Sequence, residues 1–245
     1  PSGDTDIELF SENSESSGYE NCCEMINVPY MHELGYKGQG QAIVIIDSVL
    51  DVNHEFFSSP IENPKYSKSD VAKIIQEKHL NVDISANQVW RSDKIPFAYN
   101  YASKNADVYS DDSIHGTHVC GVAAGKNGTR KDGTKFSSVA TETQIIFMAV
   151  HNKSNNTLDD TAVLAASDDA SKMDIAAINM SFCYGPYMMY TDELYEKIIN
   201  TATNAGILVS SSVGNYGRCS TRAEYPDCST GGLPDSISAT TSVAS

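Results

Sequence analysis

The stretch Gln41-Ala42-Ile43-Val44-Ile45-Ile46-Asp47 decides the fold that we expect for this chain. Its uninterrupted run of Ile and Val is short, which is typical of a strand that is buried on both faces. Similar apolar runs follow at residues 144–150, 175–182 and 206–211. Strands of this kind occur mainly in parallel sheets whose two faces are covered by helices.

Helical patterns alternate with these runs. Residues 161–173 are rich in Ala and begin with acidic side chains, and residues 191–205 begin at Thr191 and end before Gly206. Thr is a common N-cap and Gly a common residue just after a helix. The alternation predicts an α/β fold with a parallel sheet flanked by helices.

Two other regions differ from this pattern. Residues 1–20 are rich in Ser, Glu and Gly, which predicts a flexible N-terminal arm before a domain at 21–245. Residues 58–110 are polar, with a short helix expected over 70–78. We expect them to form an insertion or an elaborated surface loop, which would include Tyr99 and Tyr101.

The composition excludes several classes of function. The chain has 245 residues and a net charge of -15, which argues against nucleic-acid binding because a phosphate backbone needs a basic surface. No apolar run is long enough to span a bilayer. The six cysteines include no Cys-x-x-Cys pair, which argues against zinc ribbons and thioredoxin-like sites. Whether Cys219 and Cys228 form a disulfide is left open by the sequence.

Three polar residues stand where functional groups gather in parallel α/β sheets, which is at the carboxyl ends of strands. Asp47 ends the first apolar run, Asn215 follows the last one, and His115 opens a Gly- and Ala-rich helical segment. Acyl transfer needs a carboxylate to orient an imidazole, an imidazole to take a proton, and a donor for the oxyanion. Asp47, His115 and Asn215 fit these roles in that order, although Asn215 would also suit a left-handed turn after Gly214.

Four segments together resemble the subtilisin-like serine proteases. They lie in the same order along the chain: residues 38–48, His115-Gly116-Thr117-His118-Val119, Ile178-Asn179-Met180-Ser181 and Val213-Gly214-Asn215. The resemblance implies that the first two carry a catalytic aspartate and histidine, the third lines a substrate cleft, and the fourth forms the oxyanion hole. It also implies that His118 is a packed helix residue and not a metal ligand. Asn53-His54-Glu55 and the long insertion before the histidine are similar to the lactocepin-type cell-envelope proteinases.

The resemblance also implies which residues bind the substrate. These are Ser181, Phe182, Cys183, Ser212, Val213 and Gly214. For Phe182, packing against the sheet is the alternative. No cofactor is expected for the chemistry, but structural calcium is common in the family. Asp111, Asp112 and Asp132 are candidate calcium ligands, with solvated acidic loops as the simpler interpretation.

The sequence departs from the family pattern at three places. Val49 replaces the usual glycine two residues after the aspartate, and Cys183 and Tyr184 stand where glycines are common. The nucleophile motif Gly-Thr-Ser-Met-Ala is absent from these 245 residues. We therefore expect the N-terminal portion of a catalytic domain, whose serine lies on a companion chain made by cleavage.

These features predict a serine endopeptidase that is secreted or held at a bacterial cell surface and acts on peptides or proteins. The alternative is an inactive pseudoprotease that uses the same scaffold for binding or regulation.

Overall fold

The computed structural model describes residues 18–129, 133, 135–152, 157–183, 193–214, 234 and 237–243. The chain divides into two compact units, Pro1–Lys37 and Gly38–Ser245. The first unit contains α1 (Gly18–Met25) and α2 (Val28–Glu33). Most of the predicted N-terminal arm lies outside the described residues.

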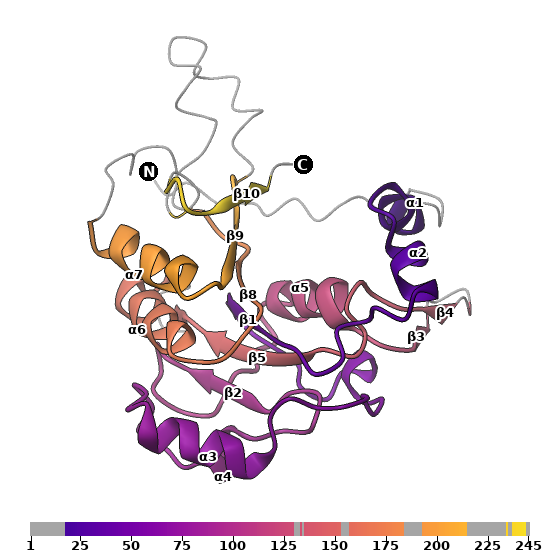
Figure 1. Cartoon of the computed structure of the whole chain (residues 1–245). Coiled ribbons are helices and arrows are strands. Elements are labelled where there is room, and N and C mark those ends of the chain that lie inside the picture. Colours follow the sequence, from indigo (N-terminus) through magenta and orange to yellow (C-terminus); the bar gives the residue numbers. More distant parts are fainter. Residues whose placement is uncertain are drawn as a thin grey trace. The chain divides into compact units, whose positions relative to one another are not determined.

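A parallel sheet forms the centre of the second unit (Figure 1). Its strand order is β10-β9-β8-β1-β5-β2, and all neighbouring strands run parallel. This confirms the predicted α/β fold. The strands are β1 (Ala42–Asp47), β2 (Phe97–Asn100), β5 (Gln144–Ala149), β8 (Ala177–Met180), β9 (Leu208–Ser212) and β10 (Thr241–Val243).

Helices cover both faces of the sheet and enclose two hydrophobic clusters (Figure 1). The larger cluster lies beneath α3 (Lys68–Glu77), α4 (Ala86–Val89), α6 (Asp160–Ser171) and α7 (Glu193–Asn204). The smaller cluster lies beneath α5 (His115–Ala124). Strand β1 supplies Val44 and Ile46 to the larger cluster and Ile45 to the smaller one, as the alternation of side chains along a strand requires.

The short elements lie in the connections. The 3-10 helix η1 (Glu55–Phe57) follows β1. The pairs β3 (Gly128–Thr129) with β4 (Lys135–Phe136) and β6 (His151–Asn152) with β7 (Thr157–Leu158) are antiparallel.

Strand β2 corrects the prediction for residues 58–110. We expected a surface region there, but β2 pairs with β5 and forms one edge strand of the main sheet. Phe97 and Tyr99 face the larger cluster and Ala98 the smaller one, and Tyr99 and Tyr101 are buried. Phe97 and Tyr99 were only a weak local signal for this strand, since aromatic residues are enriched in strands generally. The helix expected over 70–78 is present as α3.

Strands β8 and β9 correct a second expectation. They were predicted to be buried on both faces, yet their burial alternates along the chain. Ile178, Met180 and Val209 are buried in the larger cluster, whereas Leu208 is 55% exposed on the opposite face. Among the described residues, α5 covers that second face over β1 and β5, and the face is only partly covered over β8 and β9.

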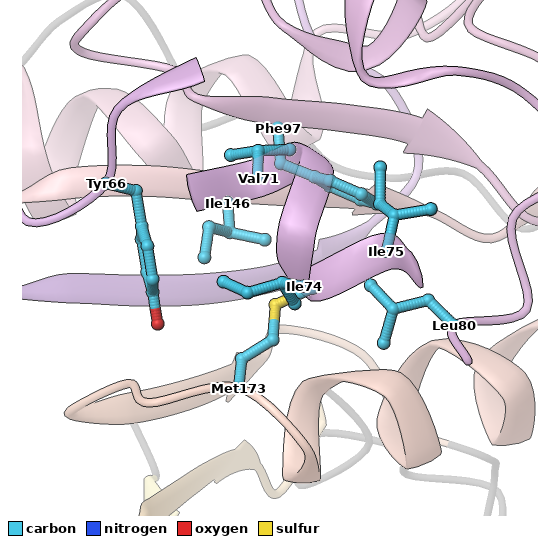
Figure 2. Close-up of a pocket in the computed structure, with 8 residues that line it drawn as sticks. All are labelled: Tyr66, Val71, Ile74, Ile75, Leu80, Phe97, Ile146 and Met173. Carbon is cyan, nitrogen blue, oxygen red and sulfur yellow. The ribbon is translucent and has the colours of Figure 1, made fainter. Parts of the chain in front are cut away.

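A small apolar cavity lies between α3 and the sheet (Figure 2). Its volume is about 10 Å³, and the side chains that line it belong to the hydrophobic core or pack against it. A space of this size holds about one water molecule, and an apolar lining offers water no partner. The cavity is therefore a packing defect and not a ligand site.

Candidate active site

Asp47 and His115 meet at the carboxyl edge of the sheet. Asp47 is the last residue of β1 and His115 the first residue of α5. The His115 Nδ1 atom lies 2.9 Å from Asp47 Oδ1 and 3.1 Å from Asp47 Oδ2. The Asp47 side chain is 2% exposed and the His115 side chain 44%, so the pair has a buried carboxylate and an accessible ring.

The local backbone holds the Asp47 carboxylate in place. The Ser48 amide donates to Asp47 Oδ1 at 2.6 Å, and the Ser48 hydroxyl donates to the same oxygen at 3.0 Å. The Asp47 carbonyl accepts a hydrogen bond from the Val150 amide at 3.0 Å. A buried carboxylate is stable only when its oxygens are hydrogen-bonded. Ser48 meets this requirement at Oδ1, and His115 Nδ1 contacts both oxygens.

The hydrogen bond to Asp47 raises the pKa of His115 above its ordinary value, although partial burial opposes the shift. A carboxylate can only accept, so the Nδ1 atom of His115 carries the proton that faces Asp47. In the neutral ring the lone pair then lies on Nε2. The pair is thus arranged to accept a proton at Nε2 and to stabilise the imidazolium that results.

Gly116 explains how α5 approaches β1 so closely. A Cβ atom at this position would lie 3.1 Å from Asp47 Oδ1 and 2.9 Å from the Phe147 ring. The next residue, Thr117, accepts a hydrogen bond from the Asp51 amide at 2.8 Å, which ties the loop after β1 to the helix.

Val49, one of the three departures from the family pattern, is accommodated without backbone strain. It is buried, and it is not among the described non-glycine residues with positive φ. A β-branched side chain is costly mainly at positive φ, so the turn after Asp47 tolerates valine.

The predicted cleft residues after β8 lie at the same edge of the sheet. The Asn179 amide donates to Ser181 Oγ at 2.8 Å. Phe182 is partly buried against the larger cluster, as the packing alternative expected, and Cys183 is partly exposed. Tyr184 lies outside the described residues.

The segment after β9 turns sharply at Gly214, whose φ is +82°. The Ser212 hydroxyl accepts from the Gly214 amide at 3.0 Å, and the Val213 amide donates to the Val243 carbonyl at 3.0 Å. Asn215, the predicted oxyanion donor, lies outside the described residues, as do Cys219 and Cys228.

The described residues contain no group of three or more His, Cys, Asp or Glu side chains placed to hold a metal ion. Asp111 accepts a hydrogen bond from the Tyr109 hydroxyl, and Asp112 from Ser110. Asp132 lies outside the described part, so structural calcium stays a prediction.

Two further expectations concern His118 and the membrane. His118 was expected to pack within the protein, but its side chain is exposed. No described helix has the length and apolarity that crossing a membrane requires.

Sequence reasoning did not single out Ser48, Ser113 or Thr117 as functional. The available signal was position: Ser48 follows the aspartate directly, Ser113 precedes the histidine by two residues, and Thr117 follows it by two. Short hydroxyl side chains near strand ends and helix starts commonly bind backbone groups.

Comparison with known sequences identifies the family to which this chain belongs. Residues 38–245 match the profile of the subtilase family. The chain belongs to the subtilase family. This match confirms the resemblance and covers the second structural unit.

Curated relatives are large bacterial proteinases. This subtilase chain is 30% identical to the PI-type proteinase of Lactococcus lactis subsp. cremoris over 207 residues, which are 82% of this chain and 10% of that protein. It is 29% identical to the C5a peptidase of a Streptococcus pyogenes strain over 230 residues, 89% of this chain and 19% of that protein. The chain therefore spans a tenth to a fifth of the length of these relatives.

A solved structure supports the fold. The crystal structure of a lanthipeptide protease aligns with a TM-score of 0.57 and 18% sequence identity. The alignment covers 91% of this chain and 54% of that one. At this identity the likeness concerns the arrangement of helices and strands.

Proposed function

We propose that this subtilase chain supplies the aspartate and histidine of a serine endopeptidase. The observation that carries the proposal is the hydrogen bond between a buried Asp47 and an accessible His115. In this mechanism His115 Nε2 takes the proton of a serine hydroxyl as that oxygen attacks the scissile carbonyl. The same imidazolium then protonates the leaving amine, and water hydrolyses the acyl-enzyme.

The serine comes from a segment outside these 245 residues. Support comes from the absence of the nucleophile motif in the sequence and from the much greater length of the relatives. The face of β8 and β9 that α5 leaves open is the place where we propose that this segment packs, beside the exposed His118 and Val122 of α5. Such a segment would place its hydroxyl next to Nε2 of His115.

Asn215 completes the site in this proposal. Its side-chain amide donates to the oxyanion together with the backbone amide of the serine, an interaction that typically lowers the barrier by about 3–4 kcal/mol. Residues 181–183 and 212–214 flank an extended peptide substrate, whose backbone pairs with them as an added strand. The bacterial relatives favour a secreted or cell-surface protease.

A fluorophosphonate probe tests the proposal on the complete gene product. We expect one serine outside residues 1–245 to be labelled, with labelling abolished by His115→Ala. A denaturing gel separates the two sources of this serine, because a companion chain migrates apart from the present chain and a continuous polypeptide does not. Labelling of a serine within these residues would contradict the proposal, and no labelling would indicate a pseudoprotease.

A further inference from the structure

A ring of hydrogen bonds links the two members of the Asp47–His115 pair a second time. The His115 backbone amide donates to Ser113 Oγ at 3.3 Å. The Ser113 and Ser48 hydroxyl oxygens lie 3.4 Å apart, and the Ser48 hydroxyl donates to Asp47 Oδ1 at 3.0 Å. The side-chain contact between His115 Nδ1 and Asp47 closes the ring.

The protons in this ring have only one consistent arrangement. Each serine hydroxyl has a single proton to donate. Ser48 donates to the carboxylate, which can only accept, so Ser113 must donate to Ser48. Ser113 Oγ then accepts from the His115 amide. The hydrogen bonds therefore run in one direction, from the His115 amide through Ser113 and Ser48 to Asp47. Hydrogen bonds aligned in this way strengthen one another.

The ring joins two separate elements. Ser48 follows the end of β1, and Ser113 lies just before the start of α5. The Ser113 contact also satisfies one of the amides that lack a partner at the start of a helix. The His115 ring is 44% exposed, so packing around the ring restrains it only in part. The hydrogen bond from its backbone amide to Ser113 adds a second restraint.

We propose that Ser113 is a positioning residue, which acts through Ser48 to hold the Asp47 carboxylate and the His115 imidazole in register. This inference rests on the proposed proteolytic function. The Ser113 hydroxyl contacts Ser48 Oγ and the His115 backbone amide, so in this proposal it acts through these groups and not on the reacting atoms. A threonine keeps that hydroxyl, whereas an alanine removes it with little change in volume.

The test uses the complete gene product and compares Ser113→Ala with Ser113→Thr. We expect Ser113→Ala to lower kcat by about 10- to 100-fold without raising KM, because the general base is misplaced while substrate contacts remain. Ser113→Thr should keep most of the parent kcat. Ser58→Ala is the matched control, since the Ser58 hydroxyl donates to the Glu55 carbonyl away from the ring.

A second readout does not depend on turnover. The proton between His115 Nδ1 and Asp47 should give a low-field ¹H NMR signal in the parent, in Ser113→Thr and in Ser58→Ala, and a broadened or missing signal in Ser113→Ala. An unchanged signal and kcat in Ser113→Ala would overturn the inference, as would equal losses in both Ser113 variants. If the parent protein itself lacks peptidase activity, the proposed function fails, and the NMR comparison still decides whether the ring positions His115.

Discussion

Gly116 lies so close to the turn after β1 that a Cβ atom there would be 2.3 Å from the Val49 carbonyl oxygen. The obstacle is backbone, which cannot rotate away as the end of a side chain can. Gly116→Ala should therefore push α5 away from β1, destabilise the fold by about 1–3 kcal/mol and reduce peptidase activity. Urea unfolding and a peptide-hydrolysis assay measure the two effects.

The matched control for this substitution is Gly121→Ala in the same helix. A Cβ atom there would lie 3.2 Å from the ring of Phe56, and this side chain needs to move by only a few tenths of an ångström to make room. Because alanine also favours helix more than glycine does, we expect little loss of stability or activity. Equal damage from both substitutions would contradict the assignment of Gly116 to a close contact.

Replacement of the carboxylate tests the role of Asp47 directly. An amide can donate to Nδ1, so Asp47→Asn permits the tautomer in which Nε2 carries the proton and cannot accept another. We expect kcat to fall by about 10⁴-fold, as measured by peptide hydrolysis with the fold checked by circular dichroism. The control is Glu77→Gln, which removes the charge of an exposed carboxylate at the end of α3 and should retain activity.

The pH dependence of activity follows from the His115 pKa, which the hydrogen bond to Asp47 raises. The general base must be neutral, so activity should be low in acid and rise with pH through a value above the 6.5 of an ordinary histidine. In Asp47→Asn the residual activity should begin to rise at lower pH, because the raising interaction is lost. Profiles of kcat/KM against pH measure both, and an acid limb that does not move would exclude His115 as the titrating group.

Lys94 predicts a pH dependence of stability. Its amine is buried and donates to the carbonyls of Thr141 at 2.9 Å and Thr143 at 2.7 Å, which matches the two protons of a neutral amine. Burial lowers the pKa of Lys94 from 10.5 to about 7. Between these values the unfolded chain binds a proton that the folded protein does not, so this residue makes the free energy of unfolding rise with pH.

Lys94→Met removes this titration while filling similar space. The variant loses two hydrogen bonds at every pH. The free energy of unfolding of the parent minus that of the variant should become more positive from pH 7 to pH 9, because only the parent gains stability from the neutral Lys94 amine. Chemical denaturation at several pH values measures it. A difference that stays constant or shrinks over this range would be inconsistent with a neutral buried amine.

Sequence reasoning worked best where periodicity and chemistry agreed. The run 42–46 followed by Asp47 predicts both a central strand and the placement of its carboxylate, because buried parallel strands carry functional groups at their carboxyl ends. It failed at β2, where four residues within a polar region form part of the sheet. Pairing with β5 determines that strand, and pairing between distant segments leaves little trace in local composition.

The contact between Ser48 and Ser113 could not be predicted from the local sequence either. Ser48 and Ser113 are 65 residues apart, and neither stands out by composition. The second face of β8 and β9, which the described residues leave partly exposed, could not be predicted either, because an apolar run shows what a strand can bury and not what covers it.

Asp47 ends a strand and His115 begins a helix, so each side chain is fixed by a rigid element and by the contacts of Ser48 and Ser113 next to it. The segment between them is 67 residues long. That intervening segment contributes β2 to the rim of the sheet and otherwise runs through helices and loops of its own. Its loops can lengthen, shorten or acquire new surface without changing the distance from carboxylate to ring. We therefore expect homologous chains to differ more in these loops than at the Asp47–His115 pair.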